Sequence, residues 1–172
     1  MAKNPLADLL GIDADFLADL VATLRERGET VATAESLTGG LVAAALTSVP
    51  GSSAVVRGGV IVYATPLKTD LAGVDSAALA EHGPVHPLIA EQLAKGARIA
   101  CRSSWGIGLT GVAGPDPQEG VEPGVVHLAV SGSAGTTVHT VGIEGNRHQV
   151  RAGAVRGAFD LLRAQFDEPA TD

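Results

Sequence analysis

Hydrophobic positions recur every three or four residues over several stretches of the chain, as they do on one face of a helix. The clearest stretch is 13–27, which Gly28 ends, and Thr65-Pro66 is a typical start for another helix. Together these signals predict helices over 13–27, 39–48, 65–73, 76–82, 87–101 and 146–166.

Short runs of β-branched residues between these helices predict strands. The runs 125–131 and 136–141 flank a Gly-Ser-Ala-Gly segment, which is typical of a hairpin. Because helices and strands mix without strict alternation, we expect a mixed sheet covered by helices and not a purely parallel one. The predicted strands are 30–34, 55–63, 105–110, 125–131 and 136–141.

The length and composition of the chain predict one globular α/β domain. It has 172 residues, of which 45% are hydrophobic and 18% charged, so a sizeable core can form. Aromatic residues make up only 3%, and 22 glycines let helices lie close to a sheet. We expect a flexible leader over 1–12, the domain over 13–166 and a frayed tail over 167–172.

Charge and cysteine content exclude several classes of function. The net charge of −7 argues against broad contact with nucleic acid, and no apolar run is long enough to cross a membrane. Cys101 is the single cysteine, so it cannot form an internal disulfide or a thiolate metal site. His82 and His86 are separated by helix-breaking residues, and we expect no metal site. The N-terminus lacks a secretion signal, so these features predict a cytoplasmic protein.

Ser53, Tyr63 and Lys68 could form a serine-activating set without histidine or metal. Lys68 falls in the first turn of a predicted helix, where the helix dipole and burial would push the pKa of its amine down. A neutral lysine can take a proton from a serine, and Tyr63 could relay that proton. From spacing alone, ordinary roles as a turn residue, an edge aromatic and a surface charge are favoured.

Three other segments could bind a ligand, and each also has an ordinary structural explanation. The turn 33–40 offers hydroxyls and helix-start amides, or simply caps a helix. The loop 110–116 could face a ligand with free backbone amides or be a structural turn, and 117–123 could be a lid. Arg147, with Arg151 one turn later, could grip a phosphate or be a surface charge.

Taken in order, several motifs resemble those of a known family. They are Ala34-Glu-Ser-Leu-Thr-Gly-Gly40, Val49-Pro-Gly-Ser-Ser-Ala54, Gly58-Gly-Val-Ile-Val-Tyr63 with Lys68, Thr110-Gly-Val-Ala-Gly-Pro-Asp116, Gly124-Val-Val and Gly145-Asn-Arg147. Over 13–166 the chain resembles the C-terminal domain family of the competence/damage-inducible protein CinA. Members are nicotinamide mononucleotide (NMN) deamidases, which hydrolyse the carboxamide of NMN to nicotinate mononucleotide and ammonia.

The resemblance implies a single-domain, three-layer α/β/α sandwich with a mixed sheet. It also implies NMN deamidation in NAD salvage, with no metal and no other cofactor, by a protein that self-associates, a dimer being favoured. The family's catalytic set maps onto Ser53, Tyr63 and Lys68. The substrate-binding residues implied are Glu35, Ser36, Thr38, Gly39, Thr110, Gly111, Gly114 and Arg147.

The sequence departs from the family pattern at three places. Leu37 stands where the family often has cysteine, and Ala64-Thr65 lacks an asparagine that often follows the tyrosine. The segment 117–121 lacks a Gly-Gly pair found in relatives. Two alternatives therefore stay open: a nucleotide-binding or interaction domain with weak or no catalysis, or an amidase for another small carboxamide.

Overall fold

The structure, a computed structural model, describes residues 4–167 and contains a five-stranded mixed sheet. The strand order is β2-β1-β3-β4-β5, in which β1 runs parallel to β2 and β3, while β4 and β5 are antiparallel to their neighbours. The sheet therefore confirms the predicted mixture of parallel and antiparallel pairing. The strands are β1 (Val31–Glu35), β2 (Val56–Ile61), β3 (Trp105–Gly111), β4 (Val125–Ser131) and β5 (Thr136–Gly142).

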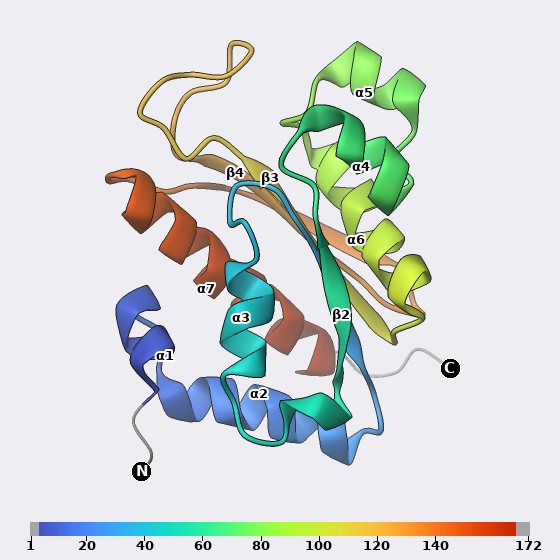
Figure 1. Ribbon diagram of the computed structural model, residues 1–172, viewed down its shortest axis with the longest axis vertical. Helices are drawn as coiled ribbons and strands as arrows, with labels where there is room; N and C mark the ends of the chain where they lie inside the picture. Colours follow the sequence, from blue (N-terminus) through green and yellow to red (C-terminus); the bar gives the residue numbers. More distant parts are fainter. Residues whose placement is uncertain (1–3, 168–172) are drawn as a thin grey trace.

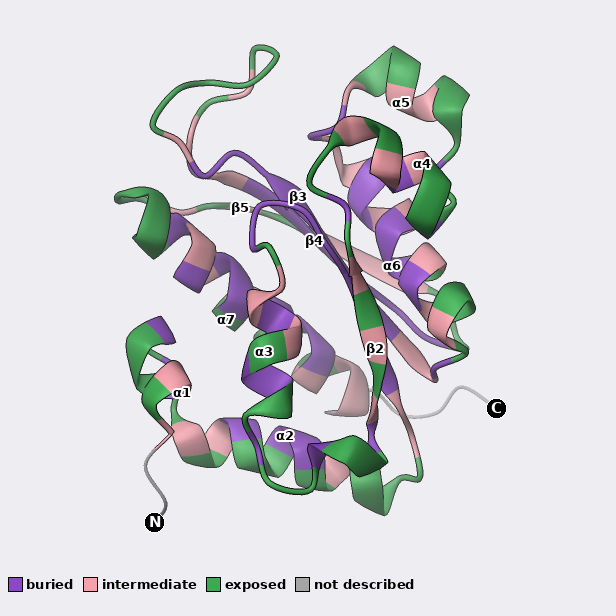
Figure 2. Ribbon diagram, viewed as in Figure 1, coloured by how far each residue is buried: buried purple, intermediate pink, exposed green. Residues whose placement is uncertain are grey.

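Helices cover both faces of the sheet and give three layers (Figure 1). The helices are α1 (Pro5–Leu10), α2 (Ala14–Glu26), α3 (Leu41–Thr47), α4 (Thr65–Ala72), α5 (Ser76–His82), α6 (Pro87–Cys101) and α7 (Arg147–Asp167), with a 3₁₀ turn η1 (Ser52–Ala54). On one face α6 contacts all five strands and carries α4 and α5 on its outer side. On the other face α7 contacts β3 and β4, with α1, α2 and α3 against it. Figure 2 shows the buried residues concentrated between these layers, and the α/β/α architecture is confirmed.

Two glycines let α6 lie directly on the backbone of β3. A Cβ on Gly106 would stand 2.0 Å from the carbonyl oxygen of Ala94, and one on Gly108 would stand 2.3 Å from the amide nitrogen of Ala94. Both distances are far inside van der Waals contact, so no larger residue fits at either position without moving the helix. The small side chains of Ala90 and Ala94 complete the close approach.

The N-terminal segment is packed where the sequence analysis expected a flexible leader. The side chain of Asn4 accepts a hydrogen bond from the amide of Ala7 and so caps α1, with Pro5 in its first turn. Ala7 and Leu10 are buried in the main core. The expectation of a leader is wrong for 4–12, and the rest of the predicted leader and the tail at 168–172 lie outside the described residues.

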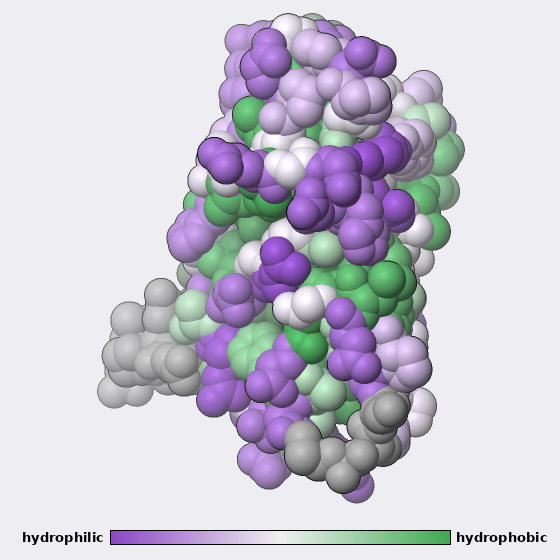
Figure 3. Space-filling model, turned by 90° about the vertical axis from the view of Figure 1, so that its left-hand side faces the viewer, coloured by the Kyte–Doolittle hydropathy of each residue, from purple (hydrophilic) through white to green (hydrophobic). Residues whose placement is uncertain are grey.

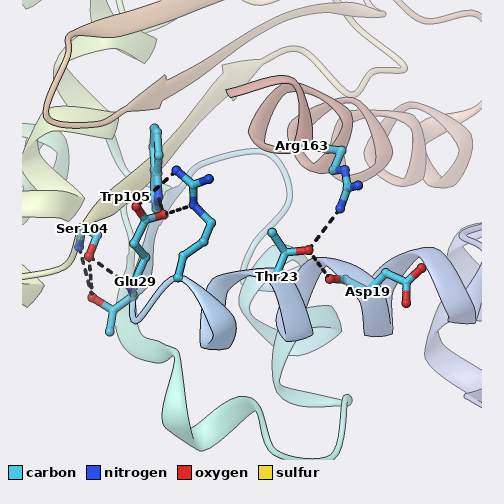
Figure 4. A network of polar contacts seen from close by, with 8 residues as sticks. Asp19, Thr23, Glu29, Ser104, Trp105 and Arg163 are labelled. Atoms are coloured by element: carbon cyan, nitrogen blue, oxygen red, sulfur yellow. Dashed lines mark hydrogen bonds and ion pairs between the residues drawn. The ribbon is translucent and has the colours of Figure 1, made fainter. Parts of the chain in front are cut away.

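Two sets of polar contacts tie the loop after α2 to β3 and α2 itself to α7 (Figure 4). Trp105 donates its indole N–H to the carboxylate of Glu29 over 2.7 Å. Thr23 accepts a hydrogen bond of 3.1 Å from Arg163 and donates one of 2.8 Å to the carbonyl oxygen of Asp19. These contacts fix the amino-terminal ends of β1 and β3 against the helical layer.

One face of the molecule mixes residue types, and none of the described helices is suited to a bilayer. In Figure 3, hydrophilic and hydrophobic residues are interspersed over the face that lies on the left of Figure 1. None of the helices within 4–167 combines the length and the apolar character needed to traverse a membrane.

Candidate active site

A cavity of about 310 Å³ opens where the three parallel strands end. Parallel strands bring their carboxyl ends to one edge of a sheet, which is where open α/β sheets hold their ligands. Here Ser36 follows β1, Tyr63 follows β2, and the segment 110–114 runs off β3. Lys68 from α4 and Arg147 from the start of α7 add positive charge to the lining. With the segment before α6, which is described below, the fold gathers six separate segments of the chain around one cavity.

Lys68 is a buried amine with two hydrogen-bond partners. Its side chain is only 1% exposed, and Nζ donates to the carbonyl oxygen of Val62 over 2.8 Å and to Oγ of Ser36 over 3.1 Å. Burial lowers the pKa of this amine to about 8, although the negative charge of Glu119 opposes the shift. An amine with this pKa is neutral in a large fraction of molecules at mildly alkaline pH and can then accept a proton.

Ser36 is the serine that the structure places beside Lys68. It follows the last residue of β1, is 8% exposed, and its amide donates to the carbonyl oxygen of Leu109 over 3.2 Å. Ser36 is one of the residues that line the cavity. A serine hydroxyl within hydrogen-bond reach of a lysine with a depressed pKa is the arrangement of a lysine-activated nucleophile. Sequence reasoning placed Ser36 only among the substrate-binding or capping residues.

Ser53, the nucleophile expected from the sequence, lies at the other end of the sheet. It is exposed in the η1 turn that precedes β2, whereas Tyr63 and Lys68 come after β2. A six-residue strand is roughly 17 Å long, so Ser53 cannot reach the amine of Lys68. The structure brings Tyr63 and Lys68 to one cavity and leaves Ser53 out, because the whole length of β2 lies between the serine and the tyrosine.

Tyr63 and Arg147 form the rim of the cavity. The phenol oxygen of Tyr63 accepts a hydrogen bond of 2.9 Å from Arg147, and the tyrosine is 59% exposed. A second nitrogen of the same guanidinium donates to the carbonyl oxygen of Gly114 over 2.8 Å. Arg147 therefore spans from the end of β2 to the loop after β3, with its positive charge beside the opening.

Glu35 has a structural role where the resemblance implied substrate binding. Its carboxylate is fully buried and accepts hydrogen bonds from the hydroxyl of Thr38 and from the amides of Gly40, Val42 and Ala43, at 2.7–3.0 Å. The carboxylate accepts hydrogen bonds from the free N–H groups at the start of α3. Its negative charge also interacts favourably with the positive end of the helix dipole. Glu35 and Thr38 are thus used internally, and neither Thr38 nor Ser36 supplies the cap of α3.

Arg151 holds the turn that carries Ser36. Its guanidinium donates to the carbonyl oxygens of Leu37 and Thr38 at 3.0 and 2.9 Å. Leu37 lines the cavity, whereas Gly39 does not. Two of the donor groups of Arg151 are therefore occupied by this turn, and the residue supports from α7 the loop that carries Ser36.

Part of the cavity wall comes from the segment before α6. The hydroxyl of Thr110 is buried and donates to the carbonyl oxygen of Pro84 over 2.6 Å. Pro84 and Val85 line the cavity together with Gly111 and Gly114. The sequence analysis named the cavity residues that follow β3 but missed Pro84 and Val85. These two residues belong to no recognisable motif, and the contact of Pro84 with Thr110 is seen only in the fold.

No metal site appears among residues 4–167, where no group of three or more His, Cys, Asp or Glu side chains is placed to hold an ion. Two histidines, His82 and His86, instead stack on each other with ring centroids 4.4 Å apart. His86 also accepts a hydrogen bond from the amide of Leu88 and so caps α6.

We expect His127 to make folding stability depend on pH. Burial lowers the pKa of His127 from its ordinary value of 6.5, and the neighbouring His86 lowers it further. Below pH 6.5 the unfolded chain therefore binds more protons at this position than the folded chain does. The free energy of unfolding should be fully retained above pH 6.5 and should fall as the pH decreases below it. Urea titrations from pH 5 to 8 measure this slope.

The matched variants for this prediction are His127→Asn and His139→Gln. His127 bonds Thr140 over 2.8 Å inside the sheet, whereas His139 is exposed on β5. His127→Asn should flatten the slope below pH 6.5, and His139→Gln should leave it unchanged. Equal slopes in all three proteins would contradict the assignment.

Comparison with known proteins identifies the family. The sequence model of the CinA C-terminal domain matches residues 13–166. A CinA-like protein of Anaeromyxobacter dehalogenans (strain 2CP-C) is 47% identical over 157 residues, which are 90% of this chain and 38% of that protein. A CinA-like protein of Frankia casuarinae is 42% identical over 153 residues, which are 89% of this chain and 35% of that protein. The chain thus spans less than two fifths of the length of these relatives.

Solved structures share the whole fold. The competence/damage inducible protein CihA from Agrobacterium tumefaciens superposes with a TM-score of 0.86 at 34% identity, covering 97% of this chain and all of that one. A CinA superfamily protein from Klebsiella pneumoniae gives a TM-score of 0.85 at 28% identity, covering 88% of this chain and 95% of that one. The chain belongs to the CinA C-terminal domain family.

Proposed function

We propose that the protein is an amidohydrolase that converts NMN to nicotinate mononucleotide and ammonia, a reaction of pyridine-nucleotide salvage. The observation that carries this proposal is the buried amine of Lys68, 3.1 Å from the hydroxyl of Ser36 inside a cavity with an arginine at its rim. The pair supplies a nucleophile and its base, and the arginine supplies a charge for a phosphate. The substrate follows from the family resemblance, and the catalytic serine differs from the one that the sequence suggested.

In the first half of the reaction, the neutral amine of Lys68 takes the proton of the Ser36 hydroxyl. The serine oxygen then bonds to the carboxamide carbon, and the carbonyl electrons move onto oxygen. The cavity-lining segment with Ala113 and Gly114 supports stabilisation of that oxyanion through its backbone amides. When the C–N bond breaks, the ammonium of Lys68 returns a proton to the nitrogen, and ammonia leaves a nicotinoyl ester on Ser36.

In the second half, Lys68 takes a proton from water, and the hydroxide attacks the ester carbon. Breaking of the C–O bond releases nicotinate mononucleotide, and Lys68 passes the proton back to the oxygen of Ser36. The base must be neutral at the start of the cycle. Activity should therefore rise with pH through about 8, the pKa to which burial lowers Lys68.

The test of the function is ammonia release from NMN by the purified protein, measured with a coupled dehydrogenase assay from pH 6.5 to 9.5. Nicotinamide and nicotinamide riboside serve as comparison substrates, since each carries the same carboxamide without the phosphate. Ammonia release that is fastest with NMN is the expected result. Absence of release from NMN over the whole pH range would refute the proposed activity. Faster release from a non-nucleotide carboxamide would mean that NMN is not the preferred substrate.

Arg147 is proposed to bind the 5′-phosphate of NMN. A charge-assisted bond between a guanidinium and a phosphate contributes about 1.5–3 kcal/mol, which corresponds to roughly a 10- to 100-fold change in binding. Arg147→Ala should therefore raise KM for NMN by about 10- to 100-fold and change kcat much less. Steady-state kinetics with NMN measures both parameters.

Nicotinamide riboside provides the control for Arg147, because it lacks the phosphate. Wild type and Arg147→Ala should hydrolyse the riboside with similar kcat/KM. A second control is Arg57→Ala, since Arg57 is exposed on β2 and bonds the carbonyl oxygen of Cys101. An equal loss with both substrates would mean that Arg147 only supports the rim formed with Tyr63.

A further inference from the structure

Two polar side chains of the cavity lining have no partner and no part in the reaction described above. Seven of the lining residues carry a polar side chain: Ser36, Tyr63, Lys68, Thr110, Asp116, Gln118 and Arg147. Five of these side chains already form hydrogen bonds within the protein. The side chains of Asp116 and Gln118 are exposed and form no hydrogen bond or ion pair with the residues of 4–167. Both are therefore available to a ligand.

The loop that carries these two residues joins β3 to β4 and reaches past the ends of both strands (Figure 1). Pro115 and Pro117 flank Asp116 in the sequence. A proline ring fixes its own φ and disfavours helical backbone for the residue before it. Gln118 exchanges two backbone hydrogen bonds with Val121, of 3.0 and 2.9 Å. The backbone at both positions is thus restricted before a ligand binds, which lowers the entropy cost of binding.

Asp116 lies near the place proposed for the phosphate of the substrate. Arg147 donates a hydrogen bond of 2.8 Å to the carbonyl oxygen of Gly114. Asp116 follows Gly114 by two residues, so the two Cα atoms are at most about 7 Å apart. A carboxylate repels a phosphate but accepts hydrogen bonds from hydroxyl groups. In a nucleotide, the group that adjoins the 5′-phosphate and carries hydroxyls is the ribose.

We propose that Asp116, together with Gln118, binds the 2′- and 3′-hydroxyls of a ribose 5-phosphate and so makes the site specific for ribonucleotides. The inference rests on the proposed function and names the sugar that the site takes. The two oxygens of one carboxylate can each accept a hydrogen bond from a cis-diol, and the amide of Gln118 can both donate and accept. Carboxylates hold ribose hydroxyls in this way in dinucleotide-binding folds. Within 4–167, Asp116 is the one carboxylate that lines the cavity.

The binding test compares NMN with 2′-deoxy-NMN, which lacks one of the two hydroxyls. Calorimetry in the Ser36→Ala background, where neither nucleotide is hydrolysed, should give a Kd about 10-fold lower for NMN, because a hydrogen bond to a charged group is lost with the hydroxyl. Adding Asp116→Ala should make the two Kd values equal. Glu122→Ala is the matched control and should keep the preference, since Glu122 is an exposed glutamate of the same loop that does not line the cavity.

The kinetic test measures ammonia release from the same two nucleotides. In wild type and in Glu122→Ala, kcat/KM should be about 10-fold higher for NMN than for 2′-deoxy-NMN. In Asp116→Ala the two values should be equal. If Asp116 only shapes the loop, or only attracts the positive ring of the substrate, its removal would lower both values by the same factor and leave their ratio unchanged. That result would overturn the inference.

The two tests separate this inference from the proposed function. If NMN is hydrolysed but 2′-deoxy-NMN is hydrolysed and bound equally well, the deamidase activity stands and the ribose contact is wrong. If wild type releases no ammonia, the activity is refuted, and calorimetry on wild type decides the ribose contact by itself. A preference for NMN that disappears in Asp116→Ala would then still support the contact, and equal or undetectable binding of the two nucleotides would refute it.

Discussion

Replacing Ser36 with alanine should lower kcat for NMN at least about 1000-fold, because the reaction loses its nucleophile while the base and the phosphate contact remain. Ser53→Ala should stay within about twofold of wild type, since Ser53 lies on the η1 turn at the opposite end of β2. Both substitutions remove one hydroxyl from a serine of the same chain. Their contrast therefore tests the position of the serine and not merely its chemistry. Single-turnover and steady-state ammonia release measure the effect.

Binding of NMN separates a lost nucleophile from a lost fold. Calorimetry should give similar Kd values for NMN with Ser36→Ala and with Lys68→Met. The second variant lacks the base but keeps the rim formed by Tyr63 and Arg147. The result that would reverse the assignment is a large loss in Ser53→Ala together with near-normal activity in Ser36→Ala. Such an outcome would return the nucleophile to the residue that the sequence suggested.

Replacing Glu35 with alanine should lower the free energy of unfolding by about 3–5 kcal/mol. The substitution leaves three backbone amides and the hydroxyl of Thr38 without their acceptor in a buried place. It also removes the negative charge at the start of α3, where the helix dipole favours it. Urea denaturation followed by circular dichroism measures the change in midpoint and slope.

Glu26→Ala is the matched control for Glu35, because Glu26 is an exposed glutamate at the end of α2. It should change the free energy of unfolding by no more than about 0.5 kcal/mol. Glu35→Gln should fall between the two, since the amide keeps one acceptor oxygen but presents a donor to the backbone amides. A Glu35→Ala protein as stable as Glu26→Ala, but unable to bind NMN, would support the substrate-binding role that the resemblance implied.

Most elements could be predicted because their signals are local. Pro87 marks the start of α6, and the extent of its apolar stripe indicates where the helix ends. Gly73 marks the end of α4. The failures come from contacts that no local pattern records. Glu35 caps α3 from inside a strand, five to eight residues before the amides that it bonds. A buried strand glutamate gives no capping signal of the usual kind.

The site was predictable only in part, for the same reason. Tyr63 and Lys68 lie close together because β2 has ended before both, so their short separation in sequence is also a short distance in space. Ser53 precedes Tyr63 in the sequence but lies on the other side of the strand. Ser36 is distant in sequence, and only the parallel register of β1 with β2, which one sequence does not reveal, brings it to Lys68. The rule that parallel strands carry ligands at their carboxyl ends could have identified Ser36.

The two glycines under α6 have a consequence for which molecules the protein admits. Gly106 and Gly108 fix the height of α6 above β3 by direct backbone contact. Pro84 and Val85, which precede α6, are held at that height and form a wall of the cavity. The width available to a flat aromatic ring is therefore set by the spacing between two layers of backbone. Selection by size then resides in the scaffold, and changes to the lining side chains can alter chemistry while leaving the size limit in place.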